Sequence, residues 1–218
     1  MLIRYIGGFP PPYGGVTVKN QLIYDTIKQH IPIKKLKKIR WLPKYLYEII
    51  EILLSLLPNQ RLLIGISASN GKSKIYTKIL YTFAKKNMKN SLYFMMGGTE
   101  ALRIASSKKE IEMYKNFKMI YVETKTMLCQ LKEAGMQNVE YFPNCRKRPS
   151  SKEPVYTVEG RLKCLFFSRV QTMKGTDIIL QTAKLCPSVE FYFYGEIDED
   201  YKNVFLNSVN TCDNVHYN

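Results

Sequence analysis

Short apolar runs that end in glycine or proline alternate along this chain with longer segments of helical periodicity. Runs of this kind indicate buried strands that feed into turns. The expected strands are residues 2–6, 61–67, 91–96, 119–122, 139–142, 162–167 and 189–194. Strands that alternate with helices form parallel sheets covered on both faces. The sequence therefore predicts an α/β fold.

The charge balance divides the chain near residue 150. Residues 1–150 hold 26 Lys and Arg against 9 Asp and Glu, whereas residues 151–218 hold 7 against 9. A basic stretch with Pro and Ser, residues 146–154, lies at this change. We expect a first domain over 1–150 and a partial second domain over 151–218, because only two clear strands and one helix follow the boundary. The basic first domain predicts an anionic partner.

Composition excludes several classes of function. Five scattered cysteines without a CxxC pair indicate reduced thiols and a cytoplasmic protein. Two histidines make a His-built metal site unexpected, so no metal is predicted. The N-terminus lacks the pattern of a secretion signal, and no apolar run reaches the ~20 residues that span a bilayer. No nucleic-acid-binding motif is visible, so no nucleic-acid partner is expected.

A basic segment with one tryptophan precedes an apolar helix candidate over residues 43–57. The segment contains Lys34, Lys35, Lys37, Lys38, Arg40 and Trp41. One interpretation is a solvated loop before a core helix whose Lys44, Glu48 and Glu51 share one face. The other is a membrane-facing surface that docks on anionic lipid head groups, peripherally at the inner face of the plasma membrane. The residues alone leave both open.

A glycine-rich segment, Gly7–Gly15, lies between the first strand and the first helix. Glycines let the backbone approach a ligand closely, and a helix N-terminus favours an anion. Gly14 and Gly15 are therefore candidate phosphate-binding residues. The alternative is a structural turn, since the segment does not match GxGxxG.

A second candidate site follows the strand at residues 162–167. Arg169 and Lys174 are five residues apart on this strand-end loop, and Gly175 precedes the next helix. The two cations could bind one diphosphate, Arg as a planar fork and Lys as a point charge. Ligands of parallel sheets lie beyond the carboxyl ends of the strands. The alternative is a pair of ordinary surface cations.

A segment similar to a P-loop is excluded by its spacing. Gly65 and Gly71 are separated by five residues, whereas the P-loop has four. No Asp-bearing apolar strand stands out as a partner for magnesium. ATP or GTP hydrolysis is not expected.

Several segments in series resemble the family-four (group 1) glycosyltransferases, which have the GT-B fold. They are the opening glycine-rich loop, Phe142-Pro143-Asn144, the segment from Phe167 to Asp177, and Phe193-Tyr194-Gly195. The resemblance implies two Rossmann-like domains that face each other, with a nucleotide-sugar bound mainly to the second. It also implies transfer of a sugar to a glycan or lipid-linked acceptor in surface polysaccharide synthesis, with retention of configuration and without a metal or other cofactor.

The resemblance also assigns roles to residues. Gly14, Gly15, Arg169 and Lys174 would bind the donor phosphates, and Gly97, Gly98 and Asn144 would lie on the acceptor side. Many family members have a histidine near Gly97-Gly98, where this chain has Met95-Met96. Glu100 and Glu123 are nearby carboxylates, and we expect them to be solvated or to cap helices. No catalytic residue is assigned.

The chain stops before the two glutamates that complete the family's donor site. The resemblance therefore implies a chain truncated in its second domain, which a downstream polypeptide would complete. The alternative function is a non-catalytic remnant or split-gene half that binds phosphate or a membrane surface.

Overall fold

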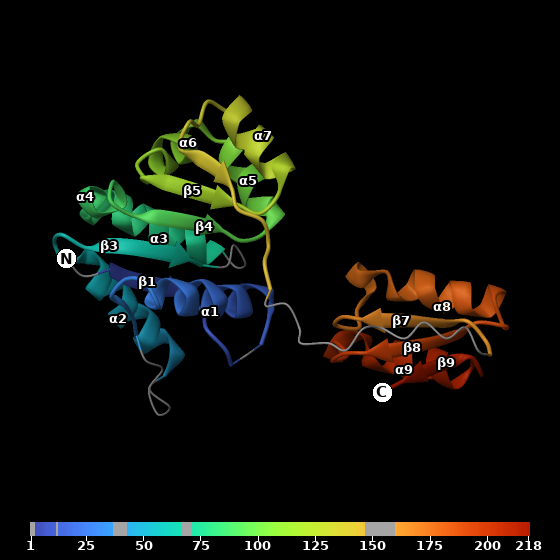
Figure 1. Cartoon of the computed structure of the whole chain (residues 1–218). Helices are drawn as coiled ribbons and strands as arrows, with labels where there is room; N and C mark the ends of the chain where they lie inside the picture. The colour runs from blue at the N-terminus through green and yellow to red at the C-terminus, as the bar shows by residue number, and fades with distance from the viewer. Residues whose placement is uncertain (1–2, 12, 37–42, 67–70, 147–159) are drawn as a thin grey trace. The chain divides into compact units, whose positions relative to one another are not determined.

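A computed structural model of the chain describes residues 3–11, 13–36, 43–66, 71–146 and 160–218. The chain divides into two compact units, Met1–Pro149 and Ser150–Asn218. Figure 1 shows each unit as a layer of strands with helices packed along it.

The first unit is built on a six-stranded sheet whose described neighbours all pair in parallel. Neighbouring residues such as Tyr5 and Ile6 are both fully buried, so both faces of the sheet are covered, as is typical of parallel sheets. Gly7 pairs with Gly65, which aligns the ends of the first and third strands. In spatial order the strands are β2 (Ile33–Lys35), β1 (Ile3–Gly7), β3 (Arg61–Gly65), β4 (Leu92–Met95), β5 (Met119–Val122) and β6 (Val139–Tyr141).

Two buried clusters hold the helices of this unit against the sheet. The larger joins Ile6, Ile64 and Met95 to side chains of α3, α5, α6 and α7. The smaller joins Tyr5 and Phe94 to α1. The described helices are α1 (Gly15–Lys28), α2 (Lys44–Leu56), α3 (Lys72–Phe83), α4 (Lys85–Met88), α5 (Gly98–Ala105), α6 (Lys108–Tyr114) and α7 (Lys125–Glu133).

Local sequence explains where α6 and α7 begin and end. The hydroxyl of Ser107 accepts a hydrogen bond from the Glu110 N–H, and that of Thr124 accepts one from the Met127 N–H. These bonds satisfy N–H groups that a helix start leaves free. Gly135 follows α7 at φ 84°, a left-handed conformation that favours glycine and stops a helix.

The second unit has a smaller parallel sheet of three strands in the order β7-β8-β9. Its core gathers Val170, Phe193 and Phe205 with side chains of the flanking helices. Its described elements are β7 (Lys163–Phe167), η2 (Thr172–Lys174), α8 (Thr176–Leu185), β8 (Glu190–Tyr194), η3 (Glu199–Tyr201), α9 (Lys202–Asn210) and β9 (Val215–Tyr217).

The parallel α/β fold class predicted from the sequence is confirmed, and two details are corrected. The second unit has a third strand and a second helix that the sequence did not predict. β9 is three residues long, and α9 buries only Phe205, so neither produces a clear pattern. On α2, Glu48 pairs with Lys72 at the surface, whereas Glu51 is buried.

Candidate functional site

The glycine-rich segment Gly7–Gly15 connects the carboxyl end of β1 to the N-terminus of α1. Gly14 is the N-cap of α1 and offers no side chain to the N–H groups of the first turn. Its own N–H donates to Oγ1 of Thr17 at 2.9 Å, and this hydroxyl donates to the Gly14 carbonyl at 3.1 Å. The amide groups that begin α1 thus lie at the positive end of the helix dipole, which favours an anion.

Asn20 fixes the start of this segment. Its side-chain amide donates to the carbonyl oxygens of Gly8 at 2.8 Å and Gly65 at 2.7 Å, and its oxygen accepts from the Tyr5 hydroxyl at 2.9 Å. A Cβ at Gly65 would overlap the Asn20 side chain, so this packing requires glycine. The ends of β1 and β3 and the second turn of α1 are therefore held together.

A buried ion pair lies at the same edge of the sheet. The side chain of Lys19 is 2% exposed, and its Nζ donates to Oε1 of Glu123 at 2.9 Å. The ring centroid of Phe142 is 5.3 Å from this ammonium. Glu123 and Phe142 directly follow β5 and β6, so both lie at the carboxyl ends of strands. The expected solvated or capping Glu123 is corrected, because it is the partner of a buried cation.

This ion pair leaves hydrogen-bonding capacity on the ammonium. An ammonium carries three N–H donors. Among the described residues, the Lys19 ammonium donates a hydrogen bond to the side chain of Glu123, and its other N–H groups remain for a ligand or water. Lys19 also lies four residues after Gly15 and therefore on the same side of α1. Its spacing from the glycines was the one sequence signal that could have revealed it.

Asn144 and Arg146 lie beside the N-terminus of α1. Nη1 of Arg146 donates to Oδ1 of Asn144 at 2.8 Å and to the Cys145 carbonyl at 2.7 Å. Nη2 reaches the Gly15 carbonyl at 3.5 Å. The structure thus brings together three predicted residues, Gly14, Gly15 and Asn144. It adds Arg146, which the sequence indicated only as part of a basic stretch.

Gly97 and Gly98 begin α5 at the carboxyl end of β4. Gly97 is the N-cap at φ 116°, a conformation that favours glycine. A Cβ at Gly98 would meet no atom within 4 Å. Met95 and Met96 are buried in the core, so they act as packing residues in this unit. In the described part of the chain, no hydrogen bond joins these two glycines to Lys19 or Arg146.

Glu100 differs from the expectation of a solvated or capping carboxylate. The residue is 1% exposed, and its Oε1 accepts hydrogen bonds from the hydroxyls of Tyr93 at 2.9 Å and Tyr114 at 3.1 Å. Arg103 lies 3.3 Å from the same oxygen. Burial raises the pKa of Glu100, while its hydrogen bonds and Arg103 oppose the rise. Glu100 is an internal structural carboxyl of the first unit.

In the second unit, Arg169 and Lys174 both lie beyond the carboxyl end of β7 with exposed side chains. The backbone on either side of Arg169 is fixed, because the N–H of Ser168 donates to Tyr194 and that of Val170 to Glu196. Val170 is fully buried, and its neighbour Arg169 therefore points outward. Neither cation has a hydrogen-bond or ion-pair partner among the described residues.

Two glycines shape the loop that carries these cations. Gly195 ends β8 at φ 144°, and a Cβ there would overlap the carbonyl oxygen of Ser168. Gly175 begins α8 at φ 74°, with no atom near its missing Cβ. In the first turn of α8, Asp177 accepts a hydrogen bond from the Tyr201 hydroxyl. The Asp177 carboxylate is therefore already hydrogen-bonded within the second unit.

The basic segment of the first unit is described only in part. Lys34 is exposed on β2, but the ammonium of Lys35 donates to Gln21 at 2.8 Å and lies 4.0 Å from the ring centroid of Phe9. Burial lowers the pKa of Lys35, and nearby Asp25 opposes this change. Of the predicted membrane-facing residues, Lys37, Lys38, Arg40 and Trp41 lie outside the described residues.

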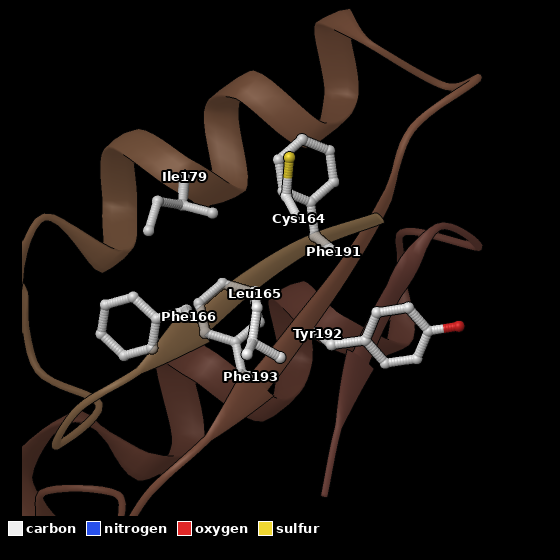
Figure 2. A pocket seen from close by; sticks show the side chains of 7 residues that line it. All are labelled: Cys164, Leu165, Phe166, Ile179, Phe191, Tyr192 and Phe193. Carbon is white, nitrogen blue, oxygen red and sulfur yellow. The ribbon is translucent and has the colours of Figure 1, made fainter. Parts of the chain in front are cut away.

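Other features of the described residues do not form a competing site. No group of three or more His, Cys, Asp and Glu there could share a metal ion. In the same residues, no helix combines the length and the apolarity needed to cross a membrane. An apolar hollow of about 210 Å³ is lined by Ile179 of α8 and by residues of β7 and β8, and Figure 2 shows Ile179 on the helix above Phe166. No charged side chain lines it, so it is unsuited to a phosphate.

Comparison with known proteins shows the fold of the chain. No protein-family model matches it, and no curated protein matches it in sequence. Among solved structures, it is similar to Anabaena Alr3699/HepE, whose crystal structure is a complex with UDP and glucose. The TM-score is 0.59 at 10% sequence identity, over 99% of this chain and 68% of the other. This likeness confirms the predicted GT-B-like fold class.

Proposed function

We propose that this protein is a glycosyltransferase that takes a sugar from a nucleotide-sugar donor. The observation that carries the proposal is the pair of exposed cations, Arg169 and Lys174, beyond the carboxyl end of β7. No protein group in the described residues neutralises them, so an anionic ligand is their natural partner. The solved structure with the same fold, which holds UDP and glucose, supports a nucleotide-sugar as that ligand.

The two cations fit the chemistry of glycosyl transfer. When the bond between the sugar and the diphosphate breaks, negative charge develops on the departing nucleotide. Cations fixed in place before the reaction stabilise that charge without reorganising. The hydrogen bonds that hold Ser168 and Val170 keep the backbone of Arg169 in such a fixed position. We propose that this stabilisation replaces a metal ion and that the anomeric configuration is retained.

The acceptor side of the proposal rests on the first unit. The amide of Gly15 and the guanidinium of Arg146 lie together at the start of α1, where they suit a donor phosphate or a phosphorylated acceptor, and Gly14 leaves room beside them because it has no side chain. Glu123 is partly exposed and is held by Lys19, so its carboxylate suits an acceptor hydroxyl. Gly97, Gly98 and Asn144 stay in the proposal as acceptor-side residues.

The proposed biological role rests on the sequence resemblance. We propose membership of glycosyltransferase family four, a glycan or lipid-linked acceptor, and a role in surface polysaccharide synthesis at the cytoplasmic face of the membrane. The strongly basic first unit supports a phosphorylated or membrane-bound acceptor, since it carries an excess of 17 positive charges over residues 1–150.

A further polypeptide segment is part of this proposal. β7 is an edge strand, and its Leu165 and Phe167 are 69% and 83% exposed. Leu165 and Phe167 alternate along β7 with Cys164 and Phe166 of the core, so one face of this strand is uncovered. Parallel sheets bury both faces of their strands, so β7 suits a further segment that pairs with its edge and covers this face. We propose that such a segment pairs with β7 and completes the donor site. Turnover by the chain alone and with an added downstream fragment measures this contribution.

Calorimetric titration with UDP-, GDP- and ADP-sugars tests the function. We expect one of these donors to bind and Arg169→Ala with Lys174→Ala to weaken it at least tenfold, about 1.4 kcal/mol. Lys184→Ala with Lys202→Ala is the matched control, because it removes two exposed cations from the same unit. Donor binding that is unchanged in the first variant, or equally weakened in the second, contradicts the site.

A further inference from the structure

Lys35 is the last residue of β2 and lies at the same edge of the sheet as the candidate site. It pairs in register with Tyr5, two residues before Gly7, so its side chain leaves the strand beside the start of the glycine-rich segment. Side chains alternate along a strand, and the neighbouring Lys34 therefore lies on the other face, where it is exposed. The two adjacent cations have different surroundings.

The ammonium of Lys35 lies over two aromatic rings. It is 4.0 Å from the ring centroid of Phe9 and 4.5 Å from that of Tyr24. The two rings meet edge to face, with their centroids 5.8 Å apart. A cation is attracted to an aromatic face, and the attraction is stronger where water is excluded. Phe9 belongs to the glycine-rich segment and Tyr24 to α1, so one ammonium contacts both elements.

A hydrogen bond extends this contact along α1. Nζ of Lys35 donates to Oε1 of Gln21 at 2.8 Å, and the Gln21 amide in turn donates to Oδ1 of Asp25 at 2.7 Å. Lys35 thus connects β2 to α1 and to the segment that leads into α1. Its ammonium is engaged within the first unit, whereas Arg169 and Lys174 of the second unit have exposed side chains.

The contact with Phe9 complements the one that Asn20 makes. Asn20 holds the carbonyl of Gly8 from α1, and Lys35 holds the side chain of the next residue from β2. Beyond Phe9 the segment leads to Tyr13, which is 83% exposed, and to the amides that begin α1. Donors that are fixed before an anion arrives stabilise it without reorganising. The segment therefore depends on the contacts that hold its beginning.

We propose that Lys35 is a positioning residue of the candidate site. Its ammonium holds Phe9 against α1 and so keeps the glycine-rich segment in the conformation that receives the anionic group of the ligand. This inference rests on the proposed function, because it assigns the residue that prepares this part of the site without itself touching the ligand.

Chymotrypsin cleavage after Tyr13 tests the proposal in the free chain. Efficient cleavage requires the segment to leave its folded conformation, which is easier once the contact with Phe9 is lost. We expect Lys35→Met, which keeps the length of the side chain but removes the charge, to be cut about fivefold faster than the wild type. Lys34→Met is the matched control. Lys35→Arg should restore the wild-type rate, because a guanidinium also binds aromatic faces.

Calorimetry with the UDP-, GDP- or ADP-sugar that binds the wild type measures the consequence for the site. We expect Lys35→Met and Phe9→Leu each to weaken donor binding about fivefold, at a temperature where circular dichroism shows both variants to be folded. The double variant should bind no more weakly than either single one, because the two side chains act through one contact. A merely stabilising contact would lower the resistance to denaturant and leave the donor affinity of the folded chain unchanged.

Three results would overturn the proposal. The first is Lys35→Met that chymotrypsin cuts at the wild-type rate. The second is Lys34→Met that is cut as fast as Lys35→Met, because the effect would then belong to the net charge. The third is donor binding that is present in the wild type and unchanged in Lys35→Met. A wild type that binds no donor contradicts the proposed function instead, and the cleavage rates then decide whether Lys35 holds the segment.

Discussion

Glu51 is a carboxyl group that the fold buries beside the start of the glycine-rich segment. Burial raises the pKa of Glu51 to about 8, and a hydrogen bond from the Gly7 N–H opposes this rise. Glu48 adds to it, and Arg4 opposes it. Oε1 of Glu51 and Nε of nearby Arg4 are buried without a hydrogen-bond partner in the described residues. With its pKa raised to about 8, Glu51 is mostly protonated at pH 7.

This proton has a measurable effect on stability. Between pH 4.5 and 8 the folded chain keeps the proton of Glu51, whereas the unfolded chain releases it. The folded state binds more protons in this window, so the free energy of unfolding should fall as pH rises, by up to about 1.4 kcal/mol per unit. Urea titrations from pH 5 to 8.5 should show this fall in the wild type and its loss in Glu51→Gln.

An exposed carboxylate on another helix provides the control for this experiment. Glu112 on α6 has a side chain that is 70% exposed and is paired with Lys115. Glu112→Gln should keep the pH dependence of the wild type. A Glu51→Gln variant whose stability still falls with the wild-type slope would show that another group holds the proton.

Asn20 should be the most sensitive polar side chain of the glycine-rich segment. Asn20→Ala leaves the carbonyls of Gly8 and Gly65 and the hydroxyl of Tyr5 without their partner. Each buried group left unpaired costs about 1–3 kcal/mol, so we expect a loss of about 3 kcal/mol in unfolding free energy. Chemical denaturation measures it, with the exposed Asn90→Ala as a control expected to stay within about 0.5 kcal/mol of the wild type.

At the scale of elements, the strands with a continuous apolar run were predictable, whereas two short strands with polar residues in them were not. β1, β3 and β8 combine such a run with a glycine that ends it. β2 and β9 have three residues each, and polar Lys34, Lys35 and His216 interrupt their patterns. These segments form strands because they pair with β1 and β8. That pairing cannot be predicted from the sequence of the segments themselves.

The candidate site also combines residues that the sequence predicted with contacts that it did not reveal. The sequence located Gly14, Gly15, Arg169 and Lys174 on two loops, because each loop connects an apolar run to a segment of helical periodicity. It did not reveal the pair of Lys19 and Glu123, which are 104 residues apart. It also did not reveal that Glu51 is buried, because helical spacing alone does not say which side of α2 faces the sheet. Contacts between distant elements decide these features.

Gly175, in the loop between β7 and α8, and Gly195, which follows β8 and packs against that loop, should respond differently to alanine. At Gly175 the space is open, so Gly175→Ala meets only the cost of a left-handed conformation, about 1 kcal/mol. At Gly195 an added Cβ would overlap the Ser168 carbonyl, so Gly195→Ala must displace the backbone beside Arg169. We expect Gly195→Ala to cost at least twice as much in denaturation and to weaken donor binding. Equal costs for the two variants would contradict this packing.

At the scale of the whole molecule, the two units have separate hydrophobic cores. The clusters around Ile6 and Tyr5 contain only residues of the first unit, and the cluster around Phe193 contains only residues of the second. Substitutions with no shared partners have additive effects on stability. In calorimetric unfolding, Asn20→Ala should lower the transition of the first unit and Gly195→Ala that of the second. The double variant should show both shifts unchanged, and coupling above about 0.5 kcal/mol would mean that the cores unfold together.

The burial of Lys19 also provides an internal probe for the opening of the first unit. Acylating reagents modify neutral amines that solvent can reach, and most lysines of this basic protein are accessible to them. Lys19 is shielded by the fold and held by Glu123, so its modification requires the first unit to open. Mass spectrometry of a single tryptic site would then follow the opening rate of that unit under any buffer, ligand or lipid.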